Sequence, residues 1–106
     1  DFLTSPSGLV AYGQLLIIAE LNARITICGA DDRPVTYLGD NGAVADVAGW
    51  PNNHNERGER VRTALLEPGK FNSPHGMAVD KQGNLFVAEW LIGGRFIKLE
   101  NLRPPG

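Results

Sequence analysis

The sequence predicts an all-β protein made of two repeated antiparallel units. The 106 residues include 13 glycines and 7 prolines, which fall between short runs rich in Val, Ile, Leu, Phe and Tyr. Such punctuated apolar runs are typical of strands joined by turns. The early part of the chain also resembles the late part at a nearly constant spacing, which indicates a duplicated unit.

In the first unit, each expected strand ends at a turn. The separators are Gly13-Gln14, Leu21-Asn22-Ala23 and Gly29–Arg33. Connections this short join neighbouring strands of an antiparallel meander. The four expected strands are Gly8–Tyr12, Leu15–Glu20, Arg24–Cys28 and Pro34–Leu38.

The second unit follows an insert that is rich in Gly, Asn, Pro and charge. This insert spans residues 40–72 and contains one possible helical turn, near Val61–Leu66. Strand signals then resume, but Pro104 and Pro105 cannot continue a ladder, so only three strands are expected. These are Gly76–Asp80, Leu85–Trp90 and Arg95–Leu99.

The duplication is visible residue by residue. Ser5–Leu9 aligns with Ser73–Met77 at a spacing of 68 residues, and Leu16–Glu20 aligns with Leu85–Glu89 at a spacing of 69. Arg24-Ile25 then aligns with Arg95-Phe96 at a spacing of 71, so the length changes are confined to turns. This is the pattern that a repeated sheet should show.

Composition excludes several classes of function. With 10 Lys and Arg against 12 Asp and Glu, the chain offers no basic surface for nucleic acid or an anionic membrane. Its longest apolar run, Leu15–Ala19, is far shorter than a membrane span of roughly 20 residues. The single Cys28 is expected to be a buried apolar side chain. No Gly-x-Ser-x-Gly elbow supports nucleophilic hydrolysis.

The compartment is left open. The chain begins with Asp1 and has no basic-then-apolar leader, so either a targeting segment has been removed or the chain is part of a longer one. We expect a soluble protein, with a secreted or periplasmic location compatible with the sequence.

Phe71–Asp80, Gly83–Glu89 and Arg95–Leu99 resemble the NHL repeat, which is the blade of a family of β-propellers. The resemblance implies a propeller blade at residues 1–39, an inter-blade insert at 40–72 and a second blade, lacking its outer strand, at 73–106. Two blades cannot close a propeller, so we expect either a six-bladed ring of three chains or a fragment of a longer propeller.

The antiparallel order brings polar residues of both units to one end of the sheets. Glu20 and Glu89 end second strands, and Arg24 and Arg95 begin third strands. We expect these four residues to line a ligand site at the mouth of the central channel. The alternative is that each carboxylate braces a turn or pairs with its arginine.

His75 is the candidate metal ligand. Its segment is similar to the metal-binding segments of the peptidylglycine alpha-amidating lyase propeller, where a Pro-His dipeptide supplies one of three imidazoles to zinc. The resemblance therefore implies zinc, or calcium, as a cofactor, with His75 as the one ligand from each chain. The alternative is an imidazole that hydrogen-bonds across the channel, because Ser7 occupies the same place in the first unit.

In the insert, Trp50 and His54 could form a lid over the channel mouth. The alternative is that Trp50 anchors the insert to a blade and His54 faces solvent.

Three functions follow from these expectations. The first is a propeller unit that binds a small molecule or peptide at the His75 and Glu89 face. The second is a metal-dependent lyase or hydrolase of the amidating-lyase or lactonase kind. The third is a protein-interaction scaffold that uses its outer surface and the insert.

Overall fold

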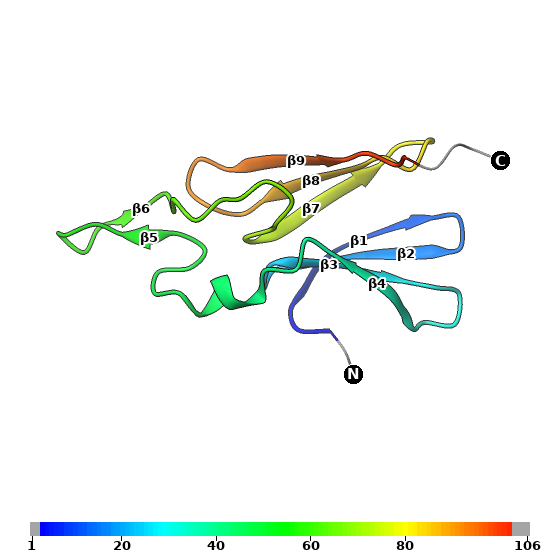
Figure 1. The fold of residues 1–106 in the computed structure, drawn as a ribbon, viewed down its shortest axis with the longest axis horizontal. Helices are drawn as coiled ribbons and strands as arrows, with labels where there is room; N and C mark the ends of the chain where they lie inside the picture. The colour runs from blue at the N-terminus through cyan, green and yellow to red at the C-terminus, as the bar shows by residue number, and fades with distance from the viewer. Residues whose placement is uncertain (1–2, 103–106) are drawn as a thin grey trace.

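A computed structural model describes residues 3–102 as two antiparallel sheets that lie face to face (Figure 1). The first sheet has the order β1-β2-β3-β4 and the second β7-β8-β9, and neither sheet is closed. The prediction of an all-β chain is therefore confirmed. The strands are β1 (Pro6–Tyr12), β2 (Leu15–Glu20), β3 (Arg24–Cys28), β4 (Pro34–Leu38), β7 (Pro74–Val79), β8 (Leu85–Glu89) and β9 (Arg95–Leu99).

The insert has little regular structure. It holds a short 3-10 helix, η1 (Gly42–Asp46), and a two-residue hairpin of β5 (Asn53–His54) and β6 (Arg60–Val61), which extends from one end of the sheets (Figure 1). The expected helical turn near Val61–Leu66 is wrong. The guanidinium of Arg62 is drawn to the carbonyls of Ile92 and Gly94, at 2.9 and 2.7 Å, so this segment follows the second sheet instead of coiling.

The strand predictions are confirmed within two residues, and the two first strands begin earlier than expected. Both β1 and β7 start at a proline, ahead of a register shift at the following residue. Pro6 pairs with Glu20 and Pro74 with Glu89, so the same bulge occurs at the same place in each unit. The duplication seen in the sequence is therefore a duplication of backbone geometry. The expectation about Pro104 and Pro105 lies outside the described residues.

The two sheets pack through inequivalent faces. Strand β1 lies against β7, and Ile17, Ala19 and Ile25 of the first sheet meet Leu85 and Val87 of the second in one core. In the repeat, however, Val87 corresponds to Ile18, whose side chain points to the opposite face from Ile17 because strand side chains alternate. The two sheets therefore contact each other through non-equivalent faces. The face that the first sheet uses corresponds, in the repeat, to the outward face of the second sheet.

Two glycines allow this close approach. A Cβ at Gly8 would lie well inside van der Waals contact with the carbonyl oxygen of His75. At the end of β4, Gly39 has a φ of 58°, and a Cβ there would lie 2.5 Å from the ring of Phe71. Phe71 is 2% exposed and directly precedes the segment entering β7, so its buried ring packs the start of the second sheet against the end of β4.

The outward faces of both sheets carry exposed apolar side chains. Phe96 is 88% exposed and Phe86 41% exposed on the second sheet, and Leu9 is 63% exposed on the first. By contrast, Cys28 is buried as expected, and this burial raises the pKa of its thiol. Residues 3–102 include no helix with the length and apolar character that crossing a membrane requires.

Candidate functional site

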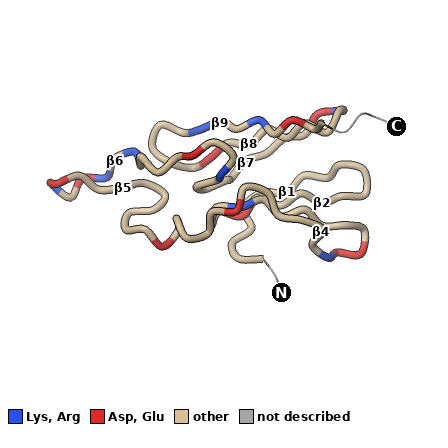
Figure 2. Tube along the Cα trace, viewed as in Figure 1, with Lys and Arg blue, Asp and Glu red and all other residues tan. Residues whose placement is uncertain are grey.

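The expected polar residues lie at one end of the sheets, where β2 and β8 end and β3 and β9 begin. Register places Glu20 opposite Arg24 and Glu89 opposite Arg95. The insert leaves and returns at the same end (Figure 1). Charged side chains of both signs alternate at the β5–β6 tip, so charge of neither sign is concentrated there (Figure 2).

Glu20 is the centre of a closed hydrogen-bond network. Its side chain is fully buried, and its Oε2 accepts from Arg24 Nε and from the hydroxyl of Thr26. Its Oε1 accepts from the backbone N–H of Thr4 at 2.5 Å and from the Thr4 hydroxyl at 3.0 Å. The carboxylate thus ties the segment before β1 to the ends of β2 and β3.

These hydrogen bonds favour the ionised form of the Glu20 carboxyl. Burial alone would raise the pKa of Glu20, but the hydrogen bonds from Arg24, Thr26 and Thr4 outweigh burial and lower that pKa overall. The same pairing raises the pKa of Arg24. Arg24 also lies over the Tyr37 ring, 4.4 Å from its centroid, which holds the guanidinium in place.

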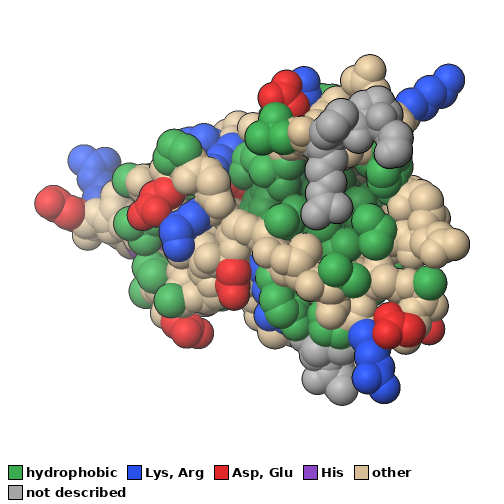
Figure 3. Space-filling view, turned by 45° about the vertical axis from the view of Figure 1, so that its right-hand side comes forward, with side chains coloured by type: hydrophobic (Ala, Val, Ile, Leu, Met, Phe, Trp, Pro, Cys, Tyr) green, Lys and Arg blue, Asp and Glu red, His purple; other side chains and the backbone are tan. Residues whose placement is uncertain are grey.

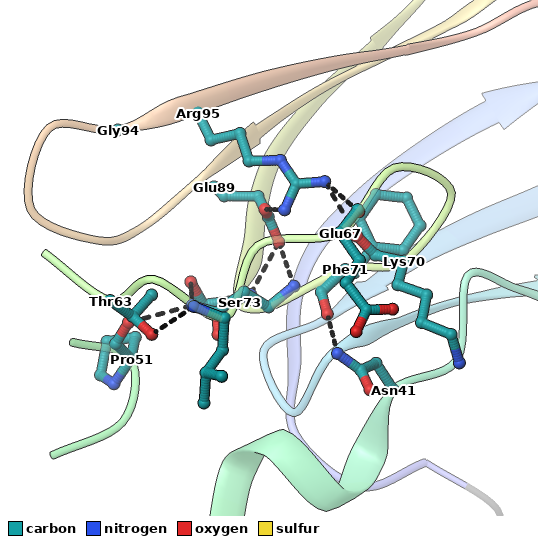
Figure 4. Close-up of polar contacts among 12 residues, drawn as sticks. Asn41, Pro51, Thr63, Glu67, Lys70, Phe71, Ser73, Glu89, Gly94 and Arg95 are labelled. Carbon is teal, nitrogen blue, oxygen red and sulfur yellow. Dashed lines mark hydrogen bonds and ion pairs between the residues drawn. The ribbon is translucent and has the colours of Figure 1, made fainter. Parts of the chain in front are cut away.

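Glu89 repeats this bracing in the second unit. Its Oε2 accepts from the backbone N–H groups of Asn72 and Ser73, at 2.5 and 2.7 Å (Figure 4). Its Oε1 faces Arg95 Nη1 at 3.4 Å, and neither of these two buried atoms has a hydrogen-bond partner among the described residues. Position 97, the counterpart of Thr26, is isoleucine, so the second network lacks the hydroxyl of the first.

The arrangement matches the bracing alternative. Both carboxylates are enclosed and pair with their arginines, and Arg95 Nη2 also donates to the carbonyls of Glu67 and Lys70, at 2.7 and 3.0 Å. The braced N–H groups belong to the segment entering the first strand, not to the turn of the glutamate itself. Thr4, Asn72 and Ser73 were missed as site residues, although their equivalent places ahead of the two prolines are visible in the repeat.

His75 lies apart from these networks. Its side chain is exposed, its ring centroid lies 6.3 Å from that of Trp90, and its imidazole makes no hydrogen bond to the residues that the structure describes. The counterpart Ser7 donates across the sheets to the carbonyl of Pro74 at 2.9 Å. Within residues 3–102 no group of three His, Cys, Asp or Glu side chains could hold a metal.

A cavity of about 450 Å³ opens between the insert and the β8–β9 loop. Trp50 and Trp90 line it, with His54 and Arg60 at the β5–β6 hairpin. The indole N–H of Trp50 donates to the carbonyl of Asn72 at 2.8 Å, so Trp50 anchors the insert, as the alternative to a lid proposed. His54 is exposed, again as that alternative expected.

Nothing in the sequence singled out Trp90 or Asn52 for this cavity. Asn52 Oδ1 accepts from the N–H of Ile92 at 2.7 Å, a contact 40 residues apart in sequence. The only signal available was the position of Trp90 as the last residue of an expected strand.

Comparison with protein-family models, with curated proteins and with solved structures produced no significant match.

Proposed function

We propose that the chain is a two-bladed unit of an NHL-like β-propeller that closes into a ring with two further copies of itself. One observation carries this proposal: the two sheets pack against each other through non-equivalent faces. Such a contact leaves one face of each kind without a partner sheet, and a heterologous contact that repeats with rotation generates a ring.

The outward faces of the two sheets are apolar, and each corresponds in the repeat to the face that the other sheet uses in the core. The outward face of the second sheet carries Phe86 and Phe96, which correspond to the core residues Ile17 and Ile25. The outward face of the first sheet carries Leu9, which is 63% exposed, beside Leu16 and Ile18, which correspond to the core residues Leu85 and Val87. Ile18 is itself only 3% exposed, so Leu9 offers most of the apolar surface on this face. Each face thus suits the other on a second copy. In a longer propeller, further blades of the same chain would cover them.

In this proposal the ligand, a small molecule or peptide, binds at the end of the sheets that carries His75. The exposed imidazole, the neighbouring Trp90 and the cavity beside the insert support this placement. Glu20, Arg24, Glu89 and Arg95 hold the strand ends that shape this end. They act as a frame behind the site because their charged groups are engaged with each other and with the backbone.

The mass in solution tests the ring. We expect analytical ultracentrifugation to give three times the chain mass of 11.5 kDa. Phe96→Asp should reduce the mass to that of one chain and leave the circular dichroism unchanged, because Phe96 is 88% exposed within the chain. Leu65→Asp, at an insert residue 47% exposed, is the matched control and should remain a trimer. A folded wild-type monomer at all concentrations would contradict the ring of three copies.

A metal-dependent lyase or hydrolase is the second candidate, favoured by the unengaged imidazole of His75. In a ring of three, each copy would supply one imidazole to the central opening, which is a ligand set that zinc accepts and calcium does not favour. We expect one zinc for every three chains by mass spectrometry of metals, lost in His75→Ala and retained in His54→Ala. The alternative role for His75 is a hydrogen bond between copies. Ser7, its counterpart, donates to the carbonyl of Pro74, so His75 would donate to the equivalent carbonyl, that of Pro6, in the next copy. Trimers without zinc would support that role and exclude the metal site.

A further inference from the structure

The cavity between the insert and the β8–β9 loop has walls that are tied together across the sequence. Asn52 Oδ1 accepts from the N–H of Ile92 at 2.7 Å, and Arg62 Nη1 donates to the carbonyl of Ile92 at 2.9 Å. In addition, Asn72 Nδ2 donates to the carbonyl of Pro51 at 3.0 Å. The cavity is therefore preformed, and its volume of about 450 Å³ falls within the range of about 300–1,000 Å³ that is typical of small-molecule sites.

The backbone carbonyls of the cavity wall are already engaged as acceptors. Five of the lining residues have a carbonyl that accepts a hydrogen bond within the chain, at 2.8 to 3.0 Å. They are Gly49, Pro51, Trp90, Leu91 and Ile92. No Asp or Glu of residues 3–102 lines the cavity. A ligand that donates hydrogen bonds, or one that carries positive charge, would thus find little to bind here.

The side chains of the same wall offer donors instead. Arg60 lines the cavity from β6, and its guanidinium forms no ion pair or hydrogen bond with the part of the chain that the structure describes. The indole N–H of Trp90 likewise has no acceptor among the described residues. A guanidinium with free N–H groups and no carboxylate beside it favours an anionic ligand, because charge-assisted hydrogen bonds are the strong ones.

Trp90 also supplies an apolar surface beside these donors. Its side chain is 60% exposed, and that of Ile92, which lines the cavity with it, is 40% exposed. An exposed indole face in a concave site can stack against another flat ring. The wall therefore suits a molecule that joins a flat apolar ring to one acidic group.

We propose that this cavity binds a small organic anion in which a carboxylate is attached to a flat apolar ring. The carboxylate would accept two parallel N–H groups from Arg60, and the ring would lie against Trp90. One guanidinium matches the single charge of a carboxylate better than the double charge of a phosphate. The inference rests on the proposed function, because it names the ligand class for the end of the sheets that carries His75, but it does not require the ring of three copies.

The probes are phenylacetate, its uncharged amide phenylacetamide, and acetate, which keeps the charge and lacks the ring. Figure 3 shows hydrophobic side chains gathered on the side that is turned forward, away from the β5–β6 hairpin, where an apolar probe could adsorb. Binding is therefore followed in the full chain by NMR at the indole N–H of Trp90, assigned with Trp90→Phe. We expect a saturable shift with phenylacetate, and at least about tenfold weaker binding of the other two probes.

Two arginine variants complete the test. Arg60→Gln should weaken the binding of phenylacetate about tenfold, because it removes a charged donor. Arg57→Gln is the matched control and should bind as the wild type does, since Arg57 is an exposed arginine at the turn of the same hairpin that does not line the cavity. Equal affinity for the three probes, equal weakening by the two substitutions, or no shift of the Trp90 signal would overturn the inference.

His75→Ala separates this inference from the proposed function. Loss of binding in His75→Ala together with full binding in Arg60→Gln would overturn the cavity as the site and leave the ligand at the His75 end. Loss of binding in Arg60→Gln by a wild-type chain that is a monomer would support the cavity and contradict the ring.

Discussion

Glu20→Ala is expected to lower the free energy of unfolding by about 3–5 kcal/mol, the usual cost of removing one partner of a buried charge pair. The substitution leaves Arg24, Thr26 and the N–H of Thr4 without their common acceptor. Because a domain has only about 5–15 kcal/mol of stability, the variant should be largely unfolded at moderate temperature. Urea unfolding followed by circular dichroism measures the loss.

The control for this prediction is Glu59→Ala. Glu59 is an exposed carboxylate that accepts one side-chain hydrogen bond, from Asn55, so its loss should cost no more than about 0.5 kcal/mol. If Glu20→Ala were no more harmful than this control, the buried carboxylate would not brace the sheets.

The same carboxylate makes stability depend on pH. Since the pKa of Glu20 is lower in the folded chain than its ordinary value of 4.5, the ionised form is the one that folding favours. Its contribution is complete above that ordinary value and is lost as the pH falls through the lowered pKa. Unfolding experiments between neutral and acidic pH should show this decline in the wild type, and a shallower decline in Glu20→Gln.

Much of the sheet structure could be predicted because the ends of the strands depend on turn residues close by in the sequence. Turn residues, short apolar runs and the repeat placed every main strand within two residues. The placement of Glu20 and Arg24 at the same end of the sheet followed as well, since they lie on either side of a tight turn. Their pairing was one of two alternatives that the sequence left open. The role of the carboxylates was harder to decide, because it depends on backbone donors that come from another segment, such as Thr4 and Asn72.

The insert could not be predicted, because long-range contacts fix its course. Arg62 reaches carbonyls of the β8–β9 loop, and Asn52 accepts from Ile92. No periodicity within the insert encodes these partners. The propensity for a helical turn near Val61–Leu66 was therefore overridden by contacts with residues about 30 positions away.

Gly8→Ala is expected to cost about 1–3 kcal/mol, the range for overfilling a packed contact. The added Cβ would overlap the carbonyl oxygen of His75 on the neighbouring sheet. Backbone cannot move aside as a flexible side chain could, so β1 and β7 must separate and weaken the core between the sheets. Thermal unfolding measures the loss of stability.

Gly76→Ala is the informative counterpart, because Gly76 occupies the same place in the second unit as Gly8 in the first. Its Cβ would meet only the side chain of Ala88, at 3.9 Å, so the folded chain should change by no more than about 0.5 kcal/mol. In a closed ring, however, that Cβ would approach the carbonyl of Ser7 in the next copy. Gly76→Ala should therefore leave a folded monomer where the wild type is a trimer. A trimeric Gly76→Ala protein would mean that further copies do not repeat the contact between the two sheets.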